Sequence, residues 1–250
     1  MNSLLALDFD GVICDSAPEN AATAWRCCRG LWPELFRGEV PQEQIQRFCQ
    51  ELRPYMETGY QSILQTWLLW SKAPLSRATT EFAANLDAVL ADAKQDKASL
   101  KALFGGERDR WLSEDENGWL SYNRFYSGAA DALRELLSRA DVRILTTKEE
   151  RFVSRLMARE GVDFPEEKIF GLGRIRNKQE TLLEWSREGA LVFVEDRLAT
   201  LQRMEGIAGL EKTALVFADW GYSTPEQRRA AAADPRIRVI ENPSRLKELV

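Results

Sequence analysis

Short apolar runs alternate with helical segments throughout the second half of this 250-residue chain. The clearest run, ALVFVED at 190–196, is almost continuously apolar, which is typical of a strand buried on both faces of a parallel sheet. Similar runs predict strands at 141–147, 167–171, 213–219 and 237–241. Helical spacing between them predicts helices at 128–140, 149–161, 181–189, 198–205 and 225–233, with a last helix at the end of the chain. Repeated strand–helix units predict a doubly wound, Rossmann-like α/β domain with a parallel sheet.

The segment that follows the first apolar run has a different pattern. Residues 58–74 and 81–93 have helical spacing, and no buried strand is evident before residue 124. Ser16 and Glu19 predict a capping box at the start of a helix, with Pro18 in its first turn. We therefore expect an all-helical domain, residues 16–123, inserted into an α/β core made of residues 1–15 and 124–250.

Composition excludes several classes of function. The net charge of -5 gives no electrostatic footprint for nucleic acid or for an anionic membrane. No apolar run approaches the roughly 18 residues of a membrane helix, and the N-terminal run lacks the basic flank of a signal peptide. The cysteine spacing fits neither a zinc site nor a disulfide framework, so we expect a reduced, cytoplasmic protein. The sequence leaves open whether the chain is a monomer or a dimer.

The chain contains no histidine. This excludes the Ser-His-Asp and Cys-His nucleophile systems and any histidine-ligated metal. Acid–base chemistry must therefore fall to carboxylates, lysine, tyrosine or cysteine. A bound metal would have oxygen ligands, which favours Mg²⁺ or Ca²⁺.

Carboxylates follow two of the predicted strands. The first apolar run leads into Asp8 and Asp10, and the run at 190–196 ends in Glu195 and Asp196. Ligands of open α/β sheets bind beyond the carboxyl ends of the strands, so these side chains are expected at one edge. Clustered carboxylates repel one another, and a divalent cation relieves the repulsion. The pattern predicts Mg²⁺ held by Asp8, Asp196 and a backbone carbonyl, together with water and a substrate phosphate.

The stretch DFDGVICDS, residues 8–16, resembles the first motif of the haloacid dehalogenase (HAD) superfamily, in its phosphatase branch. The resemblance implies that Asp8 attacks phosphorus and forms an aspartyl-phosphate. It implies that Asp10 protonates the leaving group and then deprotonates the hydrolytic water. The metal ligands predicted on this basis are Asp8, Asp10 and Asp196.

Two later stretches resemble the second and third motifs of the family. VRILTTKEERF contributes Thr146, with Thr147 as the near alternative, and the hydroxyl would hold a phosphoryl oxygen. IRNKQETLLEW contributes Lys178, whose ammonium would neutralise the phosphoryl group and the nucleophile. Thr146 and Lys178 are thus the predicted phosphate-binding residues.

The stretch LVFVEDRLATL resembles the fourth motif but departs from it. Glu195 replaces the usual glycine, and Thr200 stands where a second aspartate is common. Asp196 remains as the metal ligand. Glu195 either acts from outside the shell of direct metal ligands or supplies the negative charge of the missing second aspartate. The C-terminal stretch from residue 217 resembles phosphoglycolate-phosphatase-like members, and the helical insertion has the position of their C1-type cap, which also occurs in β-phosphoglucomutase-like members.

These resemblances imply a Mg²⁺-dependent phosphatase that acts on a small phosphorylated metabolite. Two alternatives stay open on the sequence. The first is a phosphomutase, which would return the phosphoryl group to a sugar rather than to water. The second is a binding or regulatory protein of the same fold, which the altered fourth motif suggests.

Overall fold

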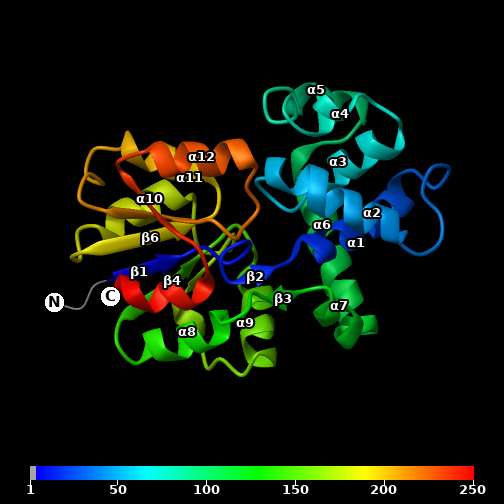
Figure 1. Ribbon diagram of the computed structural model, residues 1–250. Helices are drawn as coiled ribbons and strands as arrows, with labels where there is room; N and C mark the ends of the chain where they lie inside the picture. The colour runs from blue at the N-terminus through cyan, green and yellow to red at the C-terminus, as the bar shows by residue number, and fades with distance from the viewer. Residues whose placement is uncertain (1–3) are drawn as a thin grey trace. The chain divides into compact units, whose positions relative to one another are not determined.

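β1 (Leu4–Leu7) lies at the centre of a parallel sheet in the computed structural model, which describes residues 4–250. Within this range the sheet has six strands, in the order β5-β4-β1-β6-β7-β8 (Figure 1). The other strands are β4 (Asp141–Leu145), β5 (Ile169–Phe170), β6 (Leu191–Glu195), β7 (Ala214–Ala218) and β8 (Ile237–Ile240). Leu7 is opposite Ile144 of β4 and Val194 of β6, so the carboxyl ends of these three strands meet at one edge.

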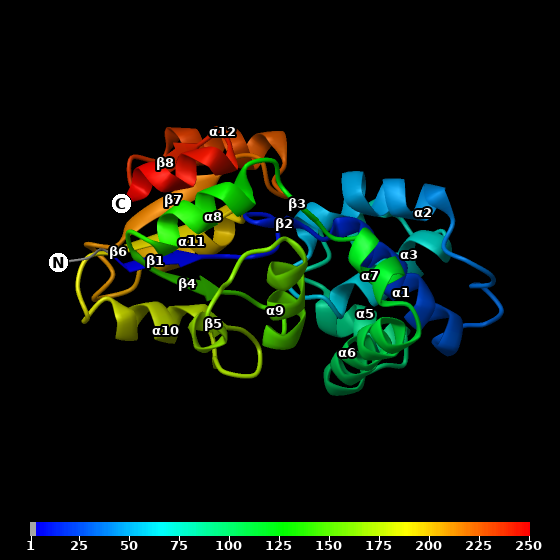
Figure 2. The same ribbon diagram turned by 90° about the horizontal axis from the view of Figure 1, so that it is seen from below.

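Helices cover both faces of the sheet, as Figures 1 and 2 show. One face is covered by α10 (Lys178–Trp185), α11 (Leu198–Glu205) and α12 (Pro225–Ala233); the other is covered by α8 (Ala129–Leu137), α9 (Glu150–Arg159) and the C-terminal 3₁₀ turns η4 (Pro243–Leu249). Leu4 and Ala6 belong to the core under α10 and α11, while Leu5 and Leu7 alternate with them and are also buried. The predicted doubly wound α/β fold is confirmed.

The predicted elements recur in order, with shifts at their ends. The helices expected at 198–205 and 225–233 have those bounds as α11 and α12. Helix α10 begins at Lys178 rather than at residue 181, because the Asn177 side chain caps it by accepting a hydrogen bond from Glu180 N at 2.8 Å. The expected terminal helix is the 3₁₀ segment η4. A further 3₁₀ turn, η3 (Glu166–Lys168), precedes β5.

Residues Ser16–Arg124 form a second compact unit, distinct from the unit made of residues 1–15 and 125–250. Its helical elements are α1 (Ala17–Leu31), α2 (Gln42–Arg47), the π-helical turn η1 (Phe48–Leu52), the 3₁₀ turn η2 (Arg53–Tyr55), α3 (Gln61–Trp70), α4 (Leu75–Ala78), α5 (Leu86–Asp92), α6 (Lys97–Glu114) and α7 (Glu116–Ser121). They enclose an aromatic-rich core that includes Trp25, Phe36, Phe48 and Phe82.

The capping box predicted at the start of α1 is wrong. Ser16 occupies the N-cap position, but its side chain makes no capping hydrogen bond. The Glu19 carboxylate is fully buried and accepts hydrogen bonds from Arg108 Nε at 2.8 Å and Nη2 at 2.5 Å. A bidentate guanidinium partner binds a buried carboxylate more strongly than one backbone amide does, which accounts for the difference.

Two short strands, β2 (Cys14–Asp15) and β3 (Arg124–Phe125), form a separate two-stranded sheet where the chain passes between the units. Among the helices of residues 4–250, none combines the length and apolar character required to cross a membrane.

Candidate active site

The chain turns sharply after β1 and leaves two aspartates at the edge of the sheet. Asp8 N donates a hydrogen bond to Val194 O at 2.9 Å, which places Asp8 beside the end of β6. Gly11 follows with φ of +94°, and Gly11 N donates to Cys14 O at 2.9 Å. A Cβ on Gly11 would lie 2.2 Å from Asp196 Oδ2, so both the turn and the close approach require glycine.

Lys178 joins the ends of β1 and β6. Its Nζ lies 2.9 Å from Asp8 Oδ1 and 2.8 Å from Glu195 Oε2. The lysine is the first residue of α10, so the Asn177 cap that starts the helix also sets the position of this side chain. The sequence-predicted residues Asp8 and Lys178 are therefore in direct contact, through an ion pair shared with Glu195.

Burial and charge shift the pKa values of this group. Loss of hydration raises the pKa of Asp8 to about 7, with a further contribution from Glu195, while Lys178 opposes the shift. Burial also raises the pKa of Glu195, and again Lys178 opposes it. The two carboxylates in turn raise the pKa of Lys178 despite its burial. Burial therefore disfavours the ionised form of both carboxylates, and Lys178 partly offsets this effect.

Asp8, Glu195 and Asp196 offer carboxylate oxygens that lie within 4.8 Å of one another. Asp196 is held in place by Tyr222 N, which donates to its Oδ2 at 2.6 Å, and Glu195 Oε1 accepts from Arg197 N at 3.2 Å. The Asp10 side chain is not part of this group. Thr200, in place of the family's second aspartate, is buried in the first turn of α11.

Asp10 instead pairs with a lysine that sequence reasoning missed. Lys148 Nζ lies 3.1 Å from Asp10 Oδ1, and the Lys148 side chain is fully buried. Thr146 is buried as well, and its hydroxyl accepts a hydrogen bond from Lys148 N at 3.1 Å. Its position in the sequence could have indicated this role. Lys148 comes two residues after Thr146, just beyond the carboxyl end of β4, which pairs with β1.

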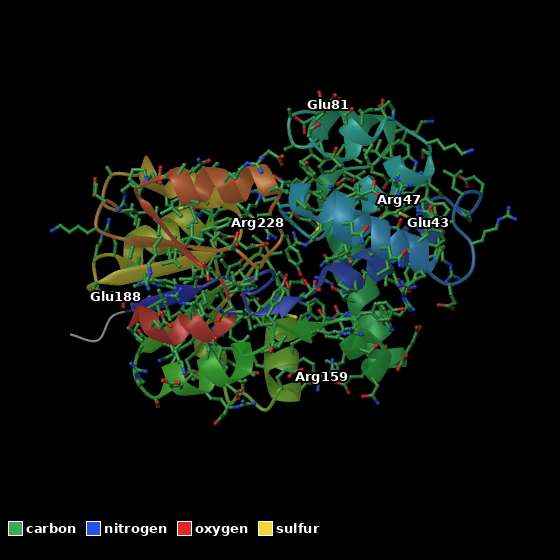
Figure 3. The ribbon with its side chains drawn as sticks, viewed as in Figure 1. Glu43, Arg47, Glu81, Arg159, Glu188 and Arg228 are labelled. Carbon is green, nitrogen blue, oxygen red and sulfur yellow. The ribbon has the colours of Figure 1, made fainter. Side chains whose placement is uncertain are left out.

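The loop after β7 packs against Asp196, and it was also missed as a functional element. A Cβ on Gly221 would lie 2.2 Å from Asp196 Cβ, and Trp220 Nε1 donates to Val12 O at 3.0 Å. Tyr222 Oη donates to Asp15 at 2.9 Å. At the start of α12, Arg228, labelled in Figure 3, donates to Ser223 Oγ at 3.1 Å. The contacts of Trp220 and Tyr222 tie the loop to the segment that follows β1.

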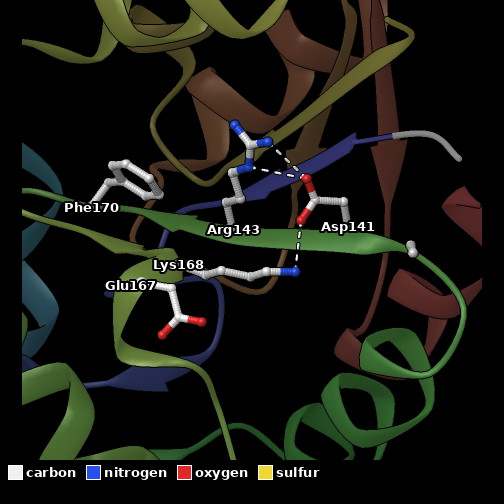
Figure 4. A pocket seen from close by; sticks show the side chains of 6 residues that line it. Asp141, Arg143, Glu167, Lys168 and Phe170 are labelled. Carbon is white, nitrogen blue, oxygen red and sulfur yellow. Dashed lines mark hydrogen bonds and ion pairs between the residues drawn. The ribbon is translucent and has the colours of Figure 1, made fainter. Parts of the chain in front are cut away.

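A second charged region surrounds an open pocket of about 510 Å³ at the amino end of β4 (Figure 4). There the Asp141 carboxylate is shared by Arg143 at 2.8 Å and Lys168 at 2.9 Å. Arg143 also pairs with Glu188 at 2.6 Å. Because this pocket lies at the opposite end of β4 from Thr146, it is separate from the acidic group.

Comparison with known proteins shows which solved structures have a similar fold. No family model and no curated protein matches the sequence. Solved structures match almost the whole chain, among them a predicted phosphoglycolate phosphatase from Haemophilus somnus, with 14% identity, a TM-score of 0.62, and coverage of 99% of this chain and 97% of that one. The chain shares the fold of this structure.

Two further solved structures match almost the whole chain, and one of them is described as a HAD-superfamily hydrolase. A predicted phosphatase from Clostridium acetobutylicum has 13% identity and a TM-score of 0.59, covering 99% of this chain and 97% of its own. A HAD-superfamily hydrolase, subfamily IA, variant 1, from Geobacter sulfurreducens has 14% identity and a TM-score of 0.54, covering 99% and 96%. At such identities the likeness concerns the fold, and the chemistry is argued from the site.

Proposed function

We propose that this protein is a Mg²⁺-dependent phosphatase that hydrolyses a small phosphorylated metabolite through an aspartyl-phosphate at Asp8. The observation that carries the proposal is the buried Asp8 carboxylate, held 2.9 Å from Lys178 at the edge of a HAD-fold sheet. Asp10, Thr146 and Asp196 lie on loops at that same edge. The helical unit, Ser16–Arg124, has the place in the chain of a HAD cap, and we assign substrate selection to it.

The residues present fit a magnesium ion. Asp8, Glu195 and Asp196 supply the hard oxygen donors that Mg²⁺ prefers. Together with Asp10, four carboxylates face the two ammonium groups of Lys148 and Lys178, which leaves a formal charge of about -2 when all are ionised. A divalent cation balances that charge, and when bound it would polarise a phosphoryl oxygen and keep Asp8 ionised.

The side chains of this protein account for both halves of the reaction. In the first half, an Asp8 oxygen bonds to phosphorus as the bond to the leaving oxygen breaks, and Asp10 donates a proton to that oxygen. In the second half, Asp10 takes a proton from water as the water oxygen bonds to phosphorus and the Asp8–phosphorus bond breaks. Lys178 stabilises negative charge around Asp8, and the Thr146 hydroxyl donates to a phosphoryl oxygen.

The test is phosphate release from p-nitrophenyl phosphate and a panel of metabolite phosphates, with Mg²⁺ and with a chelator. We expect turnover that requires Mg²⁺ and falls by at least about 10³-fold in Asp8→Asn, since the nucleophile is removed. Asp141→Asn is the matched control, because Asp141 belongs to the same unit but lies at the other end of the sheet. Full activity in Asp8→Asn would contradict the mechanism.

The same panel separates the alternatives. A phosphomutase would produce an isomeric sugar phosphate with little free phosphate. A binding protein would bind Mg²⁺ in calorimetry but would release no phosphate from any ester.

A further inference from the structure

Lys148 is a buried charge to which the proposed chemistry assigns no task. Its side chain is 0% exposed, while the Asp10 side chain that it contacts is 18% exposed. Nζ lies 3.1 Å from Asp10 Oδ1 and 3.5 Å from Oδ2. Burial of an ammonium group is costly unless it is paired, so the Asp10 contact offsets much of the cost of placing a lysine here.

The backbone of Lys148 is held from both sides. Its N–H donates to Thr146 Oγ1 at 3.1 Å, and its carbonyl accepts from Leu172 N at 3.3 Å. A Cβ on Gly171 would lie 2.2 Å from Lys148 O, so the loop after β5 packs directly on this peptide. Glu150 fixes that loop by accepting from Gly171 N at 3.1 Å. The backbone of Lys148 is therefore fixed, which holds the ammonium group beside Asp10.

Each of the two aspartates after β1 contacts a lysine of the site. Lys178 contacts Asp8 and Glu195, and Lys148 contacts Asp10. Asp10 lies on the turn after β1, with solvent on one side, and a short side chain there needs a partner to keep one rotamer. Lys148 can donate to Oδ1 whether the other oxygen carries a proton or not, so the contact is compatible with both roles of Asp10.

We propose that Lys148 is a positioning residue, which orients the Asp10 carboxyl group for proton transfer to the leaving group. This inference rests on the proposed phosphatase function. It differs from a phosphate-binding role, because it predicts that the need for Lys148 depends on how much the leaving group needs a proton.

The experiment compares two esters with different leaving groups. p-Nitrophenolate leaves readily without protonation, whereas the alkoxide of glycerol 2-phosphate requires it. In Lys148→Met, we expect kcat/KM for glycerol 2-phosphate to fall about 10- to 100-fold, and kcat/KM for p-nitrophenyl phosphate to fall by no more than about threefold. We use kcat/KM because it reports the step in which the leaving group departs.

Three variants serve as controls. Lys148→Arg, which keeps the charge, should recover most of the glycerol 2-phosphate activity. Lys168→Met removes a more exposed lysine that also pairs with an aspartate, and should leave both esters unaffected. The double variant Asp10→Asn and Lys148→Met should have the same ratio of kcat/KM for the two esters as Asp10→Asn alone, since the lysine acts through Asp10. Lys148→Gln replaces Lys148→Met if the latter does not fold.

Each outcome decides the matter. Equal losses on both esters in a folded variant, or additive losses in the double variant, overturn the positioning role. Wild-type activity with an unchanged ester ratio in Lys148→Met overturns this proposal and leaves the phosphatase function in place. No wild-type turnover of either ester or of the metabolite panel overturns both.

Discussion

Two of the buried clusters of charged side chains in residues 4–250 are balanced differently. In the helical unit, the Glu19 carboxylate faces the Arg108 guanidinium, and Thr23 and Trp119 also donate to it, at 2.6 and 3.2 Å. At the edge of the sheet, two lysines, Lys148 and Lys178, pair with three of the four carboxylates. The first cluster pairs its carboxylate with a guanidinium, whereas the named groups of the second include more carboxylates than lysines.

The two clusters illustrate two roles of buried charge, one that stabilises the fold and one that prepares a binding site. A buried charge with all its partners present holds helices together and has no further capacity to bind. A buried excess of one charge lowers stability until a ligand of opposite charge arrives. Burial raises the pKa of Asp8, and the neighbouring charge of Glu195 raises it further. Substitutions in the two clusters should therefore affect different properties.

The largest effect is expected in the balanced cluster. Arg108→Met leaves the Glu19 carboxylate buried without its guanidinium, and we expect a loss of about 3–5 kcal/mol in the free energy of unfolding. Urea denaturation would measure it. Glu19→Gln in the same chain should restore part of the loss, because the stranded charge is then removed. A change in stability below about 1 kcal/mol would show that the pair is not structurally important.

The next effect is expected at the sheet edge, and on activity rather than stability. Lys178→Met removes the cation that faces Asp8 and Glu195, and we expect kcat to fall about 10²- to 10³-fold. Stability should change much less than in Arg108→Met, because Asp8 can take up a proton when its partner is lost. Steady-state kinetics tests the expected fall in kcat, and urea denaturation of the same samples tests the expected small change in stability. Comparable unfolding energies for Lys178→Met and Arg108→Met would remove the distinction between the clusters.

The sequence predicts the sheet better than it predicts the partners of each charge. The parallel sheet and the convergence of Asp8 and Glu195 at one of its edges follow from buried apolar runs, whereas the order of the strands comes from the structure. The capping box failed because the partner of Glu19 is Arg108, 89 residues away, and local spacing contains no such information. Lys148 was missed for the same reason, since its importance comes from Asp10, 138 residues away.

The smallest effect concerns how pH changes the affinity for Mg²⁺. Because the pKa of Asp8 is raised to about 7 in the folded protein, a proton competes with the metal below that pH. We expect the apparent Kd for Mg²⁺ to be about tenfold weaker at pH 6 than at pH 8. Protonation of Asp8 also affects the stability of the fold. The raised pKa favours the metal-free folded state below about pH 4, and this contribution is lost as pH rises through 7, so Mg²⁺ should stabilise most above pH 7.

Titration calorimetry at pH 6, 7 and 8, with thermal melting at each pH with and without Mg²⁺, would measure this dependence. Asp8→Asn is the decisive comparison, since it removes the titrating group but keeps Glu195 and Asp196 as donors. Its Mg²⁺ affinity should be weaker and should change less between pH 6 and pH 8. A wild-type affinity that is flat with pH would mean that the excess charge is relieved in some other way, and that the two clusters are more alike than their composition indicates.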